Sequence, residues 1–201
     1  MKDKGIFICI EGLDGCGKTT QTKLLVKELT KKGYDAVYTA EPTHGKIGTL
    51  IREYCLHGEK RISPFAEALL FAADRLEHLE REIRPALRES KIIVSDRYIY
   101  SSLAYQGSAG VDLNWIKMIN RSALPPDLAI LIDAKPETVM QRLKLKKSVM
   151  ETLENQKKVR EIYLQFVKEK ELVKVDGNKS KKEVTDSIIQ VVTEFLEKKT
   201  L

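Results

Sequence analysis

The sequence predicts a three-layer α/β fold, in which a five-stranded parallel sheet is covered by helices on both faces. Three observations predict it: short apolar runs alternate with longer helical stretches, the connections are short, and a glycine-rich turn joins the first apolar run to a helix. Strands are expected at 6–10, 34–39, 91–95, 128–133 and 172–175. Helices are expected at 18–32, 46–57, 64–89, 98–108, 112–122, 136–147, 151–170 and 181–198.

Local signals support several of these boundaries. Ser63 and Pro64 read as an N-cap followed by proline at the first helical position. Pro85 falls late in the same helix and should kink or end it, and Pro136 opens the helix after the fourth strand. The stretch 180–183, Ser-Lys-Lys-Glu, is a capping box before the last helix.

The bulk properties indicate one soluble globular domain over residues 1–201. The chain combines 42% hydrophobic with 32% charged residues, and no apolar run approaches the ~20 residues that cross a membrane. Its net charge of +6 comes mostly from basic residues scattered among acids, so we expect neither nucleic acid nor a membrane as a partner. Cys9, Cys16 and Cys55 lack metal-site spacing, and their odd number favours reduced thiols in the cytoplasm.

Residues 12–19 match the pattern G-x-x-x-x-G-K-[ST], which is the phosphate-binding P-loop. The motif follows an apolar strand and opens a helix, as a P-loop must, whereas an ordinary glycine-rich turn is the simpler alternative. Lys18 can reach the β- and γ-phosphates of a nucleotide, and the Thr19 hydroxyl can bind Mg²⁺. We therefore expect a P-loop NTPase fold. The predicted nucleotide-binding residues are Gly12, Leu13, Asp14, Gly15, Cys16, Gly17, Lys18, Thr19 and Thr20.

A second site is predicted where the third strand ends in Asp96 and Arg97. In P-loop enzymes a carboxylate in this place holds Mg²⁺, usually through water, so Asp96 joins Thr19 as a candidate metal ligand. An arginine beside a phosphate site is suited to bidentate contact with a phosphate. The alternative is a plain ion pair between the two side chains at a sheet edge.

Three stretches resemble the thymidylate kinase family. Residues 96–106, Asp-Arg-Tyr-Ile-Tyr-Ser-Ser-Leu-Ala-Tyr-Gln, resemble its most specific signature. Residues 69–75, Leu-Leu-Phe-Ala-Ala-Asp-Arg, resemble its nucleotide-binding helix, and Asp14 in the P-loop and Glu41-Pro42 after the second strand fit as well. The resemblance extends from the first strand to the last helix.

The resemblance implies transfer of the ATP γ-phosphate to dTMP, giving dTDP and ADP. It implies that Phe71 stacks on thymine, although an aromatic ring in this apolar stretch would otherwise be read as a core residue. It implies that Arg75 reaches the base edge and the acceptor phosphate, that Arg97 clamps the dTMP phosphate, and that Asp14 bonds the sugar 3′-hydroxyl. Further acceptor-site residues implied by it are Glu41, Pro42, Ser101, Tyr105 and Gln106, with Tyr105 placed under the sugar.

The reaction so implied needs positioning and positive charge more than covalent chemistry. Both nucleotides are anionic, so Lys18, Arg97 and a Mg²⁺ ion on Thr19 and Asp96 are expected to supply the neutralising field. Mg²⁺ is thus the expected cofactor, with ATP as co-substrate. The resemblance also implies a homodimer packed through the helix that begins at Pro64 and the helix that follows Tyr98.

A basic segment lies between the fourth and fifth strands. From Arg142 to Arg160 the chain carries seven basic residues against two acidic ones. We expect a short lid at about 142–155 that closes over ATP, with Arg142 near adenine by the family pattern. The alternative is a solvated helix face with pairs such as Glu154–Lys158.

The chain departs from the family at two places. Gly15 occupies the P-loop position where one class of thymidylate kinases has an arginine, and the lid centre offers lysines instead. We therefore expect Lys146 or Lys147 to replace that arginine near the transferred phosphate. Ala40 stands where many relatives carry an arginine before the Glu-Pro pair, and Arg52 on the next helix is a candidate to compensate.

Two other functions stay open at this point. One is a kinase of another small nucleotide or nucleoside, and the other is a nucleotide-binding protein of the same fold with little turnover. A GTPase is disfavoured because residues 177–180, Gly-Asn-Lys-Ser, lack the acid of a guanine-reading motif.

Overall fold

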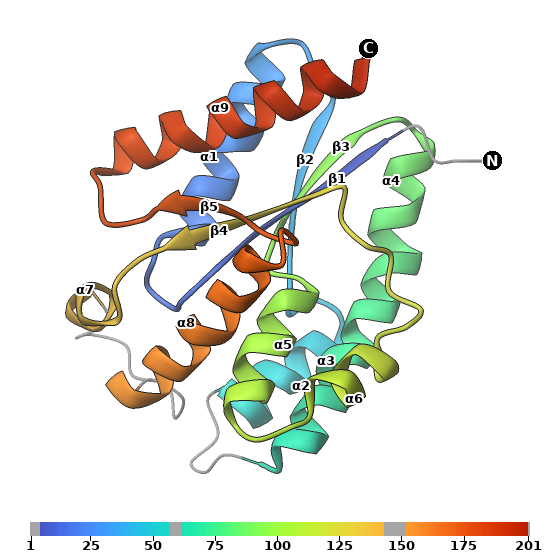
Figure 1. Ribbon diagram of the computed structural model, residues 1–201. Coiled ribbons are helices and arrows are strands. Elements are labelled where there is room, and N and C mark those ends of the chain that lie inside the picture. Colours follow the sequence, from blue (N-terminus) through green and yellow to red (C-terminus); the bar gives the residue numbers. More distant parts are fainter. Residues whose placement is uncertain (1–4, 57–61, 143–151, 201) are drawn as a thin grey trace.

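The computed structural model describes residues 5–56, 62–142 and 152–200. Its centre is a parallel five-stranded sheet in the order β2-β3-β1-β4-β5 (Figure 1). The strands are β1 (Ile6–Gly12), β2 (Ala36–Ala40), β3 (Ile92–Asp96), β4 (Leu128–Asp133) and β5 (Val173–Asp176). This confirms the predicted fold class. The fourth strand has the predicted bounds, and the edges of the other four differ from the prediction by one or two residues.

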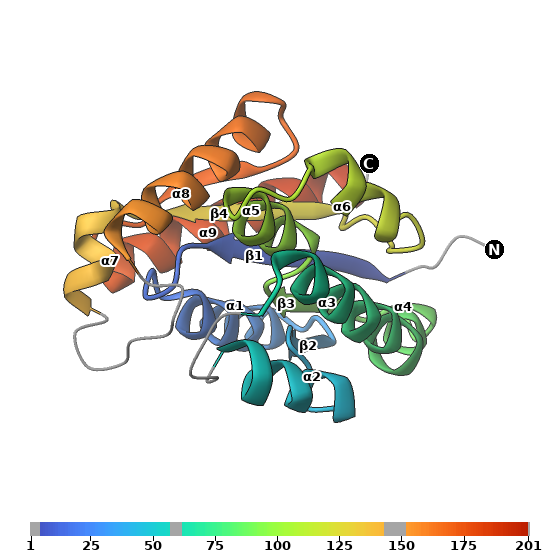
Figure 2. The ribbon, with the colours of Figure 1, turned by 90° about the horizontal axis from the view of Figure 1, so that it is seen from below.

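Helices cover both faces of the sheet. On one face lie α1 (Lys18–Lys31) and α9 (Lys181–Thr200), which pack against each other (Figure 1). On the other face α8 (Leu153–Lys168), α5 (Ile99–Ser108) and α3 (Pro64–His78) follow one another across the sheet (Figure 2). The remaining helices are α2 (Lys46–Ile51), α4 (Arg84–Arg88), α6 (Leu113–Ile119) and α7 (Pro136–Arg142). Because both faces are covered, the central strand β1 is apolar from Ile6 to Ile10, and Phe7, Ile8 and Ile10 are fully buried.

Two predicted helices are interrupted by π-helical turns. The helix expected over 46–57 is α2 followed by a π turn at Arg52–Leu56, and the helix expected over 64–89 is α3, a π turn at Leu79–Ile83 and α4. Pro85 explains the second turn. It has no N–H to donate to the carbonyl of Arg81, and its ring would clash with that carbonyl in a regular α-helix. The wider turn just before it lets the helix continue to Arg88.

The helix ends confirm some capping predictions. Ser180 and Glu183 form the capping box, with the Ser180 N–H donating to the Glu183 carboxylate at 3.0 Å and the Glu183 N–H donating to the Ser180 hydroxyl at 3.3 Å. Pro64 begins α3 as expected, but the Ser63 side chain makes no cap bond to the described backbone. Asp112 and Thr152 cap α6 and α8, which places those starts slightly later than predicted. Among the described residues, no helix combines the length and apolar character that crossing a membrane requires.

Candidate active site

The carboxyl ends of the strands bring the predicted site residues to one edge of the sheet. In the parallel register Asp96 at the end of β3 is paired with Ile10 of β1 on one side and Ala40 of β2 on the other. The P-loop therefore begins beside Asp96 and Arg97, and Glu41 follows directly on the far side. Ligands of open parallel sheets bind at this edge.

The P-loop has the backbone that phosphate binding requires. Gly15 and Gly17 have φ angles of +81° and +101°, which residues with a side chain rarely adopt. A side chain at Gly12 would place its Cβ 2.7 Å from the Ile132 carbonyl oxygen. The Lys18 ammonium is buried under the loop and donates to the carbonyls of Gly12 at 2.9 Å and Leu13 at 2.8 Å. The loop thus already surrounds the positive charge that a phosphate would meet.

Thr19 and Asp96, the predicted metal ligands, lie next to each other. The Thr19 hydroxyl donates to Oδ2 of Asp96, while Oδ1 of Asp96 is buried and has no hydrogen-bond partner among the described residues. This pair fits Mg²⁺, because the ion prefers oxygen ligands and an unpartnered buried carboxylate oxygen is a strong one. In the part of the chain that the structure describes, no cluster of three or more His, Cys, Asp or Glu side chains surrounds a possible ion.

Cys16 in the P-loop is buried, and burial raises the pKa of its thiol above the usual value, against the opposing charge of Lys18. A thiol beside phosphate-binding amides could be acidified, or it could be only a small residue that fits the loop. The raised pKa favours the second alternative.

Arg97 stands at the centre of the second predicted site and is held on three sides. Its backbone is left-handed, with φ of 72°, and its N–H donates to the Ile10 carbonyl at 3.0 Å. One guanidinium nitrogen donates to the Asp14 carboxylate and the other to the Ser101 hydroxyl at 3.1 Å. The guanidinium also lies 5.2 Å from the centre of the Tyr105 ring.

Asp14 links this arginine to the P-loop. Its backbone N–H donates to the Tyr105 hydroxyl at 2.9 Å, so the loop is tied to α5 as well. Burial alone would raise the pKa of the Asp14 carboxyl, but the charges of Arg97 and Lys18 hold it below its usual value. Asp14 is therefore ionised at neutral pH. The structure brings Asp14, Lys18, Arg97, Ser101 and Tyr105 together as one group.

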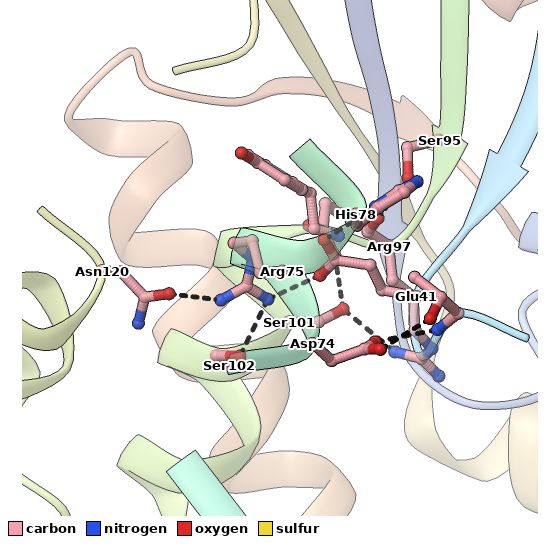
Figure 3. Close-up of polar contacts among 12 residues, drawn as sticks. Glu41, Asp74, Arg75, His78, Ser95, Arg97, Ser101, Ser102 and Asn120 are labelled. Carbon is pink, nitrogen blue, oxygen red and sulfur yellow. Dashed lines mark hydrogen bonds and ion pairs between the residues drawn. The ribbon is translucent and has the colours of Figure 1, made fainter. Parts of the chain in front are cut away.

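Arg75 lies deeper than the other predicted site residues. Its side chain is 1% exposed and donates to Glu41 at 2.7 Å, to Asn120 at 2.6 Å and to Ser102 at 3.1 Å (Figure 3). Its guanidinium also lies 5.1 Å from the centre of the Tyr98 ring. Glu41 and Arg75 were both predicted to bind the acceptor, and the structure pairs them with each other.

Of the other residues predicted around the base, Phe71 is partly buried on α3. Gln106 is buried beside Glu67, with a long contact of 3.5 Å from its amide nitrogen to the Glu67 carboxylate. The amide oxygen of Gln106 has no hydrogen-bond partner among the described residues. The contacts of Phe71 and Gln106 therefore neither support nor exclude the binding of a nucleotide base.

His78 extends the cluster around Glu41, and sequence reasoning missed it. Its Nδ1 lies 3.1 Å from Glu41, and its Nε2 lies 2.6 Å from the Thr39 hydroxyl and 3.6 Å from Glu82 (Figure 3). Although burial lowers the pKa of His78, hydrogen bonds to Glu41 and Glu82 and their charges raise it to about 9. The histidine one helical turn after Asp74-Arg75, with Glu82 four residues further on, was visible in the sequence, but Thr39 on β2 and Glu41 directly after that strand could not be identified as its partners there.

Arg52 lies where the sequence suggested that it could compensate for Ala40. It donates to the carbonyl oxygens of Pro42 and Thr43, directly after Glu41. The same turn is held from α3, because Asp74 accepts from the N–H of Thr43 at 2.8 Å and from its hydroxyl at 2.6 Å. A positive side chain is therefore present beside the Glu41-Pro42 turn.

The structure describes only the ends of the predicted lid. Arg142 is exposed at the end of α7, whereas Lys144, Lys146 and Lys147 lie outside the described residues. Arg160 on α8 makes a bidentate pair with Asp133 at the end of β4, with distances of 2.6 and 3.0 Å. The exposed pair Glu154–Lys158 is also present, with 2.8 Å between the charged atoms.

The parallel sheet, the P-loop at the end of its central strand and the helix that the loop opens define a P-loop NTPase fold. A sequence model of the family described as thymidylate kinase matches residues 10–188 of this chain. The chain therefore belongs to the thymidylate kinase family.

Individual relatives support the same assignment. A protein of Thermococcus gammatolerans named probable thymidylate kinase is 49% identical over 172 residues, covering 81% of this chain and 83% of the relative. Another of that name from Thermococcus onnurineus is 45% identical over 205 residues, covering 96% and 100%. A thymidylate kinase of Thermoanaerobacter pseudethanolicus is 41% identical over 202 residues, also covering 96% and 100%. The predicted family is confirmed, and the chain is a nucleoside monophosphate kinase, a transferase.

Proposed function

We propose that this chain transfers the γ-phosphate of ATP to dTMP, giving dTDP and ADP. The observation that carries the proposal is the position of Arg97. It lies beside the P-loop, bound to Asp14, with 19% of its side chain exposed. A cation in this place can bind the phosphate of an acceptor whose oxygen faces the donor phosphate held by the loop. Family membership favours dTMP over the other acceptors left open by the sequence.

The chemistry of the transfer follows from these charges. A dTMP phosphate oxygen forms a bond to the γ-phosphorus, while the bond from that phosphorus to the bridging oxygen breaks and ADP keeps the oxygen. The acceptor phosphate is largely ionised near neutral pH, so no general base is required. Lys18 neutralises the donor phosphates, and Arg97 neutralises the acceptor.

Thr19 and Asp96 are proposed to hold Mg²⁺, which supplies further positive charge to the donor phosphates when bound. The unpartnered Oδ1 atom of Asp96 supports this assignment. The lid is proposed to add Lys146 or Lys147 near the transferred phosphate, in place of the arginine whose P-loop position Gly15 occupies.

The acceptor pocket is proposed to use the partly buried ring of Phe71 against thymine, with Arg75, Ser101, Gln106 and the Glu41-Pro42 turn around it. The pair with Glu41 already holds the Arg75 guanidinium in place, so we propose that Arg75 is pre-positioned to donate a hydrogen bond to the base edge. Asp14 and Tyr105 are proposed to contact the sugar, since both lie against Arg97.

We also propose a homodimer. The sequence predicts that it packs through α3 and α5, but large apolar side chains are exposed on α3 and α6, with Leu69 at 52%, Leu76 at 40% and Met118 at 54%, and none is exposed on α5. The Phe65 ring on α3 packs edge-on against Trp115 on α6, with 5.3 Å between the ring centres, so we propose α3 and α6 as the contact surface instead. Cys9, Cys16 and Cys55 are all free and buried, which supports a reducing cytoplasmic location.

The decisive experiment is a phosphorylation assay with ATP and Mg²⁺ across dTMP, dUMP, other monophosphates and thymidine. We expect dTMP to give the highest kcat/KM. A higher kcat/KM for another acceptor would favour the kinase of a different nucleotide. Saturable dTMP binding without product would favour the nucleotide-binding protein with little turnover.

A further inference from the structure

Glu11, the last residue before the P-loop glycine Gly12, is a buried carboxyl that the proposed reaction does not use. Its side chain is completely inaccessible to solvent. It accepts from the backbone N–H of Tyr98 at 2.8 Å, from the Ser101 hydroxyl at 2.6 Å and from the Tyr163 hydroxyl at 3.1 Å. These donors come from the start of α5 and from α8, so one carboxyl joins three parts of the chain that are distant in sequence. The three donors offset the cost of burying the carboxyl.

The hydrogen bond from Ser101 sets the direction of its only proton. A serine hydroxyl has one donor and two acceptor positions, and here the proton points to Glu11. The oxygen of Ser101 therefore presents a lone pair to Arg97, whose guanidinium donates to it at 3.1 Å. Without the acceptor on Glu11, the serine proton could turn to the Tyr163 hydroxyl at 3.1 Å, and the direction of the Ser101 lone pairs toward Arg97 would no longer be fixed.

Tyr163 joins the same network from α8. Its hydroxyl lies 3.1 Å from both Glu11 and the Ser101 hydroxyl, and its side chain is fully buried. Arg160, one turn earlier on α8, is bound to Asp133. The helix that follows the proposed lid is thus attached at two successive turns to the ends of β1 and β4.

We propose that Glu11 is a positioning residue for Arg97, acting through Ser101, and that Tyr163 couples α8 to the same arginine. This inference rests on the proposed function, because it assigns Arg97 to the acceptor phosphate. Asp14 holds one guanidinium nitrogen and Ser101 holds the other, so the plane of the guanidinium is determined by both. Burial raises the pKa of Glu11 to about 7, while the Ser101 hydrogen bond and the charge of Arg97 oppose the shift, which agrees with a carboxyl held for these two partners.

The test uses Ser101→Ala and Glu11→Gln. The first removes the acceptor for Arg97. The second keeps the shape of the side chain but replaces one oxygen with a donor, so at least one of the three buried donors loses its acceptor. We expect either variant to raise the KM for dTMP about tenfold while the KM for ATP changes less than about twofold, as the loss of one charged hydrogen bond predicts. The KM of the double variant for dTMP should exceed that of the more affected single variant by no more than about twofold, because both substitutions act through one contact.

Two further variants sharpen the result. Tyr163→Phe removes only a hydroxyl from the network, and we expect a KM increase for dTMP of about two- to threefold. Tyr100→Phe is the matched control, because Tyr100 also lies between α5 and α8, with its ring 5.4 Å from Phe166, but outside the network. It should leave both KM values unchanged.

A readout without nucleotide separates this inference from the proposed function. Nitrogen NMR of the Arg97 guanidinium, assigned with Arg97→Lys, should show slow rotation in the unaltered chain and fast rotation in Ser101→Ala and Glu11→Gln. Slow rotation in both variants, or additive effects on dTMP binding, would overturn the inference even if dTMP is the true acceptor. If the guanidinium rotates fast in both variants but the unaltered chain does not bind dTMP, the proposed function is overturned and the positioning of Arg97 stands.

Discussion

Two arginines near the sheet edge are each paired with a carboxylate, but they sit in different environments. The Arg75–Glu41 pair is 1% and 2% exposed, whereas the Arg97–Asp14 pair is 19% and 28% exposed. Two guanidinium nitrogens of Arg75 donate to Glu41, Asn120 and Ser102, all of them buried, while its Nε has no hydrogen-bond partner among the described residues. Arg97 keeps part of its side chain exposed to solvent. We therefore propose that the buried pair supports the architecture around Glu41, and that the accessible pair can exchange a partner for a phosphate.

The largest expected effect comes from breaking the buried pair. Glu41→Ala removes the carboxylate paired with the buried Arg75 and one of the two carboxylates beside His78, and we expect a loss of about 3–5 kcal/mol in the free energy of unfolding. Asp14→Ala, which breaks the accessible pair, should cost at most about 1 kcal/mol. Urea unfolding of both variants measures the difference. Equal losses would mean that exposure does not separate the two arginines.

Removing the accessible arginine should act on catalysis instead. Arg97→Ala is expected to raise the barrier for phosphoryl transfer by about 3–4 kcal/mol, seen as a fall in kcat/KM for dTMP, with a small change in unfolding free energy. Arg97→Lys should recover little, because a lysine lacks the bidentate fork. A kinase that keeps its kcat/KM after Arg97→Ala would place the acceptor phosphate elsewhere.

The buried cluster should also make stability depend on pH. The folded pKa of His78, about 9, exceeds its ordinary value of 6.5, so its stabilising contribution is complete below pH 6.5 and is lost as pH rises through 9. The free energy of unfolding should fall by about 2–3 kcal/mol across this window because of His78. The pKa of Glu11 is raised from 4.5 to about 7, so between these two pH values its ionisation also lowers the free energy of unfolding as the pH rises.

His78→Gln isolates the histidine contribution. It should flatten the change in unfolding free energy between pH 7 and pH 9, while His44→Gln, which alters an exposed histidine, should not. Chemical denaturation at the two pH values measures both slopes. If the unfolding free energy of His78→Gln kept the same pH dependence, His78 would not be a charged member of the buried cluster.

The smallest expected effect concerns the proposed lid lysines. Lys146→Ala or Lys147→Ala should lower kcat about tenfold to a hundredfold, or roughly 1.4–2.7 kcal/mol, with a much smaller rise in KM. A cation that acts near the transferred phosphate stabilises the transition state more than the bound substrates. Steady-state kinetics with varied ATP and dTMP test this, and unchanged turnover in both variants would refute the role.

Much of this protein is determined by its sequence alone. The P-loop, its flanking strand and helix, and the alternation of strands and helices are local patterns, because each depends on residues a few positions apart. The capping box at Ser180 and Glu183 was predicted for the same reason. The residues of the 96–106 stretch carried the family, and the sheet then placed Asp96 and Arg97 beside the P-loop as expected.

Only the tertiary structure decided which polar groups meet. The π turn before Pro85 lets the helix continue to Arg88 where local preference alone predicts a kink or an end. Apart from Glu82, which is four residues from His78, the partners of Arg75, His78 and Glu11 lie more than 25 residues away along the chain, so no spacing rule could find them. Exposure was decided in the same way, because a pair of charges is buried or accessible according to the helices that cover it. The residue types specified what chemistry was available, and the packing of α3, α5 and α8 specified where each charge can act.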